Sequence, residues 1–66
     1  MNIFHKNKFR VRAFIFEKEN NKWSTHINKD FNTREEAEQE YSRVYNEWKK
    51  EIEENTFNLE DIWEHK

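Results

Sequence analysis

The spacing of apolar residues changes its period near the middle of the chain. Residues 9–13 alternate between apolar and polar side chains, and residues 9–16 and 22–28 are both rich in aromatic and β-branched residues. This pattern is typical of half-buried strands. Residues 19–21, Glu-Asn-Asn, separate the two segments, and asparagine tolerates the positive φ that turns require. The pattern predicts an antiparallel β-hairpin over residues 8–28.

The register of this hairpin can be predicted from the side chains, because a slip of one residue exchanges the two faces. The apolar residues gather on one face if Ala13 lies opposite Ile27 and Glu17 lies opposite Trp23. That face would hold Phe9, Val11, Ala13, Ile15, Trp23, Ile27 and Phe31. The register implies a loop of three or five residues and a bulge. Residues 3–5, Ile-Phe-His, are a candidate third strand.

In the second half, the apolar residues recur with the period of an α-helix. They are Ala37, Tyr41, Val44, Tyr45, Trp48 and Ile52. The preceding Thr33-Arg-Glu-Glu36 is a capping box, and Asn55 can end a helix in the left-handed conformation. These signals predict one long helix over residues 33–54. Asn58 resembles a second cap, so residues 58–65 are expected to form a short helical turn.

Together these elements predict a single α+β domain over residues 1–66, with a two- or three-stranded antiparallel sheet packed on one long helix. The chain contains no glycine, proline or cysteine. The lack of cysteine, of a long apolar run and of a signal-peptide core leads us to expect a cytoplasmic protein without membrane association.

Charge is divided between the same two halves. Residues 1–29 contain seven basic and two acidic residues, and residues 30–66 contain five basic and twelve acidic residues, so the halves carry +5 and −7. Such segregation points to binding partners.

The basic charge is expected on the side of the hairpin that a single helix leaves uncovered. This side would present Arg10, Arg12, Phe14, Phe16 and His26, a combination that suits partner binding because aromatic anchors and guanidinium groups dominate interfaces. Three arrangements are open. The N-terminal segment or the Leu59–Trp63 turn can cover the phenylalanines, a second copy can pack there, or another partner can bind. Trp63 either closes the core or anchors on a partner.

The acidic charge is expected to form a ridge along the helix. Glu36, Glu40, Glu47, Glu51 and Glu54 fall within a narrow arc on a helical wheel. The ridge is either a solvated face partly neutralised by Arg43 and Lys50 or a docking surface for a basic partner.

The sequence contains no arrangement of residues that suggests catalysis. The three histidines are far apart, and none lies three or four residues from another. The carboxylates lack an enclosing cleft, and a phosphate-binding loop would need glycine. We therefore expect no enzyme activity, no catalytic residue, no metal site and no cofactor.

Residues 9–38 resemble the arm-type DNA-binding domain at the N-terminus of tyrosine-recombinase integrases. The resemblance rests on the alternating Phe9-Arg-Val-Arg-Ala-Phe segment, the Lys22-Trp-Ser-Thr segment and Phe31-Asn-Thr-Arg-Glu-Glu-Ala-Glu at the start of the helix. It implies a small sheet packed on a helix, with the exposed sheet face in the DNA major groove. Arg10, Arg12, Lys22 and His26 would then contact DNA.

The leading hypothesis is a non-enzymatic protein-interaction module, of the kind that phages and mobile elements encode to inhibit a host factor such as a nuclease or defence complex. A basic and aromatic sheet face and an acidic helix ridge would bind the host protein. Duplex DNA binding through the sheet is the alternative, and a structural homodimer is a second alternative. The sequence does not name the partner.

Overall fold

The structure is a computed structural model that describes residues 7–66. Its elements are β1 (Lys8–Glu17), β2 (Lys22–Phe31), α1 (Arg34–Glu47), α2 (Lys49–Glu53), β3 (Phe57–Leu59) and β4 (Trp63–His65). The candidate strand at residues 3–5 lies outside the described residues.

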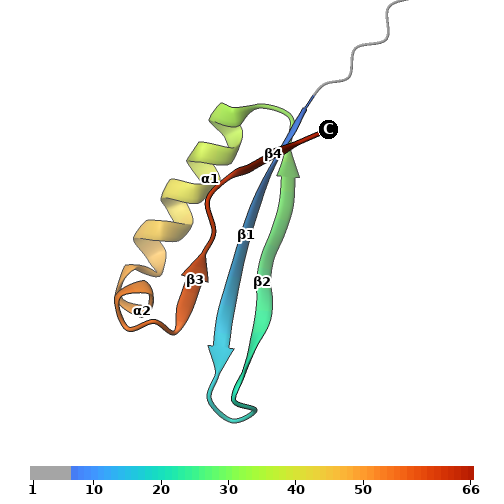
Figure 1. Cartoon of the computed structure of the whole chain (residues 1–66). Helices are drawn as coiled ribbons and strands as arrows, with labels where there is room; N and C mark the ends of the chain where they lie inside the picture. Colours follow the sequence, from blue (N-terminus) through green and yellow to red (C-terminus); the bar gives the residue numbers. More distant parts are fainter. Residues whose placement is uncertain (1–6) are drawn as a thin grey trace, which may run out of the picture.

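The sheet has four antiparallel strands, with β1 between β2 on one edge and β3 and β4 on the other (Figure 1). The expectation of two or three strands and a C-terminal helical turn is therefore wrong. A helical turn would have left the second edge of β1 without hydrogen-bond partners, which is costly for backbone groups. Instead, Phe16 N–H donates to the Thr56 carbonyl at 2.9 Å, and Glu60 N–H donates to the Arg12 carbonyl at 3.0 Å.

The hairpin follows the predicted register over only half of its length. Ala13 lies opposite Ile27 as expected, but His26 is an extra residue that shifts the pairing by one position. Beyond this expected bulge, Trp23 lies opposite Phe16 and therefore on the other face of the sheet from the one predicted.

Two asparagines adopt the positive φ angles that the glycine-free chain needs. Asn21 has a φ of 53°, and Asn55, after α2, has a φ of 63°. Asn21 lies in the loop of residues 18–21, whose length of four residues differs from the three or five predicted, because the bulge at His26 shifts the pairing by one position. The predicted roles of asparagine in the hairpin turn and at the end of the helical segment are confirmed.

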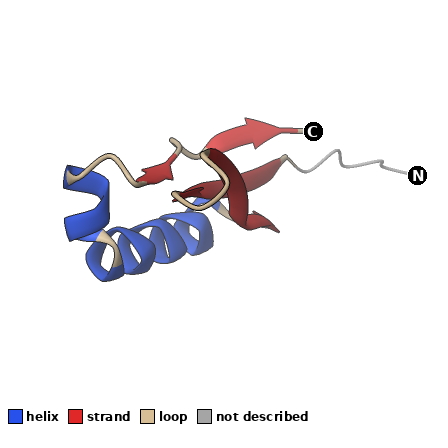
Figure 2. Ribbon diagram, turned by 90° about the horizontal axis from the view of Figure 1, so that it is seen from below, coloured by secondary structure: helices blue, strands red, loops and turns tan. Residues whose placement is uncertain are grey.

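The helical segment begins as predicted but is not one continuous helix. Thr33 Oγ1 accepts a hydrogen bond from Glu36 N–H at 3.2 Å, so the cap is confirmed. At Trp48 the backbone leaves the helical region, with a φ of −114° and a ψ of 19°, and α2 turns away from α1 (Figure 2). The prediction of one long helix over residues 33–54 is wrong. The periodicity of apolar residues continues through the break, because the Trp48 side chain still packs partly buried against the core.

A small core joins the sheet to the helical layer. The fully buried apolar residues in the described part of the chain are Val11, Ala13, Ala37, Val44 and Phe57, and Ile15, Ile27, Trp48, Ile52 and Leu59 pack partly buried around Ala13, Val44 and Phe57. Two residues expected in the core are largely outside it, since Trp23 is 46% exposed and Tyr45 is 41% exposed. With so few buried side chains, each one contributes a large share of the stability.

Candidate interaction surface on the sheet

α1 lies along one side of the sheet, and no helix within residues 7–66 covers the other side (Figure 2). Because Val11 and Ala13 are buried against α1, the alternating residues of β1 point the opposite way. We call this opposite side the open face. The strand registers place there Arg10, Arg12, Phe14 and Phe16 of β1, Trp23, Thr25, Asn28 and Asp30 of β2, Asn58 of β3, and Trp63 and His65 of β4.

One end of the open face is aromatic. The rings of Phe16 and Trp23 meet edge to face, with centroids 5.4 Å apart and planes at 62°. Phe14 and Phe16 are half-buried, so the expectation that both are exposed holds only in part, whereas Trp23 remains largely accessible. The cross-strand neighbours of Phe14 are Thr25 in β2 and Asn58 in β3, and neither is charged.

The other end contains paired charges. Arg10 binds Asp30 with two hydrogen bonds, from Nε at 2.8 Å and from Nη2 at 3.2 Å. The hydrogen bond from Arg10, followed by one from His65, lowers the pKa of Asp30 from 3.8 to about 2, and Asp30 in turn raises the pKa of Arg10. Arg12 pairs with Glu60, with Nη2 and Oε1 2.8 Å apart. Both arginines that were expected to be available to a partner are therefore already paired with acidic side chains.

Trp63 ties the C-terminal segment to these charges. The guanidinium carbons of Arg10 and Arg12 lie 5.2 Å and 5.7 Å from the centroid of the Trp63 ring, and the ring of His65 stacks on it at 4.6 Å. His65 Nε2 is also 3.2 Å from Asp30 Oδ1. Trp63 is nevertheless 48% exposed. The Leu59–Trp63 segment thus lies beside β1 in the sheet, and not over Phe14 and Phe16.

His26 does not belong to the open face, contrary to the prediction. Its ring meets Trp48 and Phe57 edge to face, with centroids 5.2 Å and 5.8 Å apart, and both of these rings belong to the core side. The bulge is the physical reason, because its extra residue breaks the alternation on which the prediction relied.

The acidic ridge is interrupted and partly neutralised. Arg43 contacts Glu40 at 2.8 Å and Glu47 at 2.9 Å, and these two carboxylates raise the pKa of Arg43. Glu36 belongs to the helix cap. Glu51 lies in α2, beyond the break at Trp48, so it does not continue the line of α1. The expected ridge is therefore not a continuous row of unpaired carboxylates, because Arg43 forms ion pairs with Glu40 and Glu47 at its centre.

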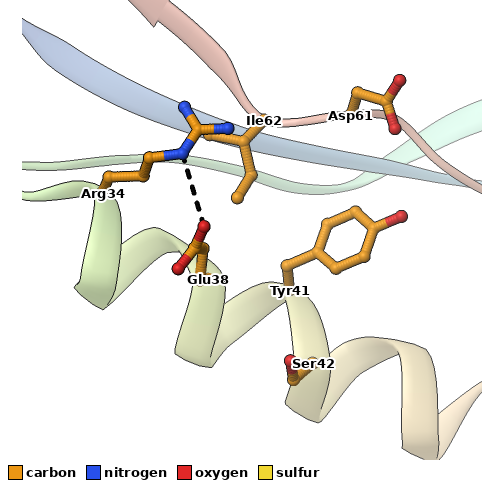
Figure 3. Close-up of a pocket in the computed structure, with 6 residues that line it drawn as sticks. All are labelled: Arg34, Glu38, Tyr41, Ser42, Asp61 and Ile62. Carbon is orange, nitrogen blue, oxygen red and sulfur yellow. Dashed lines mark ion pairs between the residues drawn. The ribbon is translucent and has the colours of Figure 1, made fainter.

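A groove runs between α1 and the connection from β3 to β4. It has a volume of about 560 Å³ and is lined by Arg34, Glu38, Tyr41 and Ser42 of α1 and by Asp61 and Ile62 of the connection. Figure 3 shows Ile62 pointing toward α1 and the ion pair between Arg34 and Glu38, in which Nε and Oε2 are 3.3 Å apart. A hollow of about 220 Å³ that shares Tyr41 and Ser42 adjoins it.

Three residues on or beside the open face were not singled out from the sequence. Asp30, Glu60 and His65 pair with residues 20 or more positions away, so no local spacing could have shown them. The alternation of Phe57 and Leu59 across Asn58 was a weak strand signal, and it could have indicated β3.

No protein-family model, curated protein or solved structure matches the chain. The resemblance to the integrase arm-type domain therefore stays a prediction. Within residues 7–66, three or more histidine or carboxylate side chains do not come together as metal ligands would. The helices of this part of the chain are also too short and polar to span a membrane.

Proposed function

We propose that the chain is a non-enzymatic protein-interaction module that binds a partner protein through the open face. The observation that supports this proposal is the pair of tryptophans on that face, since Trp23 and Trp63 are each about half exposed, at 46% and 48%. Tryptophan is among the residues that contribute most to protein interfaces, and tyrosine and arginine are the others. Inhibition of a host factor by a phage or mobile-element protein, and a cytoplasmic location, remain the finer parts of the proposal.

The charge pairs on the open face favour a protein partner over duplex DNA. DNA affinity comes largely from unpaired basic groups that neutralise phosphates. Arg10 and Arg12 would have to exchange Asp30 and Glu60 for phosphates, so the gain from each new ion pair would be reduced. In contrast, exposed indole rings beside arginines match the composition of a protein interface, in which aromatic residues and arginine are enriched.

The test is affinity capture from a host lysate with three baits. The wild type should retain a specific protein, a Trp23→Thr/Trp63→Thr variant should lose it, and Gln39→Ala should retain it. Gln39 is the control because its side chain is exposed on α1 and lies outside the open face. Circular dichroism of each bait checks that the fold is kept. Equal capture by the double variant and the wild type would contradict the proposal.

A further inference from the structure

The groove between α1 and the β3–β4 connection has the chemistry of a site for a cationic side chain. Its lining contains two carboxylates, those of Glu38 and Asp61, and one guanidinium, that of Arg34, so the balance of charge is negative. Arg34 is already bound to Glu38. No ion pair within residues 7–66 engages Asp61, which lines the groove from the β3–β4 connection (Figure 3).

The remaining lining suits a basic side chain with a long apolar stem. Tyr41 lines both the groove and the adjoining hollow, and Tyr45 lines the hollow with 41% of its surface exposed. The faces of tyrosine rings attract cations, and Ile62 offers an apolar surface on which methylene groups can pack. A carboxylate, aromatic rings and an apolar wall are together the complement of an arginine side chain.

We propose that this groove binds an arginine side chain presented by a partner protein. Asp61 pairs with the guanidinium, and the tyrosine rings lie against it. Charge complementarity also favours a basic partner over an acidic ligand, because residues 30–66, which supply every residue of the groove, carry a net charge of −7 from five basic and twelve acidic residues. The groove is separate from the open face, so this inference does not depend on the proposed function.

The test uses the isolated full-length protein and a single blocked amino acid, N-acetyl-arginine N-methylamide, followed by NMR. The control ligand is the citrulline analogue, which has nearly the same shape but no charge. Arginine should give saturable shifts of the Tyr41 and Tyr45 ring signals and of the Asp61 and Ile62 amides, and citrulline should not. Asp61→Asn should weaken arginine binding about threefold to fivefold, as expected for one partly exposed ion pair.

Two matched variants keep this test specific. Glu53→Gln removes an equivalent exposed charge from α2, outside the groove, and Trp63→Ala alters the open face. Both should leave arginine binding unchanged.

Equal binding of citrulline, equal weakening by Glu53→Gln, or full binding by Asp61→Asn would overturn the proposal. Groove signals that shift with protein concentration alone would identify a second copy as the occupant and would also overturn it. Loss of arginine binding in Trp63→Ala would show that the site lies on the open face.

Discussion

The indole of Trp48 stacks on the ring of Phe57, with centroids 4.7 Å apart and planes 12° apart. This contact joins the point where the helical segment breaks to the strand that begins after it. Backbone hydrogen bonds continue across the break. Trp48 N–H donates to the Val44 carbonyl at 3.0 Å, and Ile52 N–H donates to the Trp48 carbonyl at 2.9 Å. The break therefore costs few backbone hydrogen bonds and orients α2 toward β3.

Removing the Phe57 ring should destabilise the protein strongly. Phe57 is 2% exposed, so Phe57→Ala leaves a cavity and should lower the free energy of unfolding by about 3–5 kcal/mol. Tyr45→Ala is the control and should change it by about 0.5 kcal/mol or less, because that side chain is 41% exposed. Urea denaturation followed by circular dichroism measures both. If Phe57→Ala is already unfolded without urea, Phe57→Leu should give a smaller loss in the same direction, and no loss in either variant would contradict the predicted role of the ring.

The left-handed backbone at Asn55 gives a second prediction. Asn55 has a φ of 63°, a conformation that costs most residues with a Cβ atom about 1–2 kcal/mol. Asn55→Ala should therefore destabilise the protein, while Asn55→Gly should be neutral or stabilising. Thermal unfolding of the two variants compares them directly. A higher melting temperature for the alanine variant than for the glycine variant would be inconsistent with this backbone geometry.

The fold could be predicted from the sequence where local signals agree with the tertiary contacts. Alternation along residues 9–13 and the cap at Thr33 identified the first strand and the start of α1. The sequence pattern failed where distant contacts decide the structure. Residues 58–65 have the spacing of a helical turn, but the free edge of β1 binds them as strands. Helical periodicity likewise continues through Trp48, where the backbone breaks.

The candidate surface was predicted in part and for the same physical reasons. Alternation placed Arg10, Arg12, Phe14 and Phe16 on one face, in agreement with the register of β1. It could not show that Asp30 and Glu60 neutralise the arginines, since those ion pairs come from other strands and loops. The extra residue at His26 also reversed two assignments. His26 lies on the core side of the sheet, and Trp23 lies on the open face.

The pairing of Asp30 should make stability depend on pH in the acidic range. The pKa of Asp30 is lowered from 3.8 to about 2, so the unfolded chain takes up the proton first as the pH falls. The stabilisation from the charged carboxylate is complete above 3.8 and is lost as the pH falls through about 2. The difference in urea midpoint between wild type and Asp30→Asn should shrink over that window. A difference that stays constant from pH 6 to about 2 would show that the carboxylate charge contributes nothing.

Salt dependence should separate the two classes of partner. For each phosphate that a basic side chain neutralises, DNA affinity falls about 3.5-fold when the salt concentration rises fourfold, so binding through Arg10 and Arg12 would weaken about 12-fold. Binding of the captured protein through the open face should change by less than about threefold, because its anchors are aromatic. Calorimetric titrations at low and moderate salt measure this. A steep loss that Arg10→Ala/Arg12→Ala flattens would favour nucleic acid instead.

The most direct measurement follows the three indole N–H signals by NMR as the captured partner is added to the isotope-labelled chain. The open face is predicted to be the interface, so the signals of Trp23 and Trp63 should shift or broaden first, while Trp48, which is half-buried behind the sheet, should change little. Unchanged signals from Trp23 and Trp63, with shifts confined to α1 and α2, would contradict the assignment of binding to the open face.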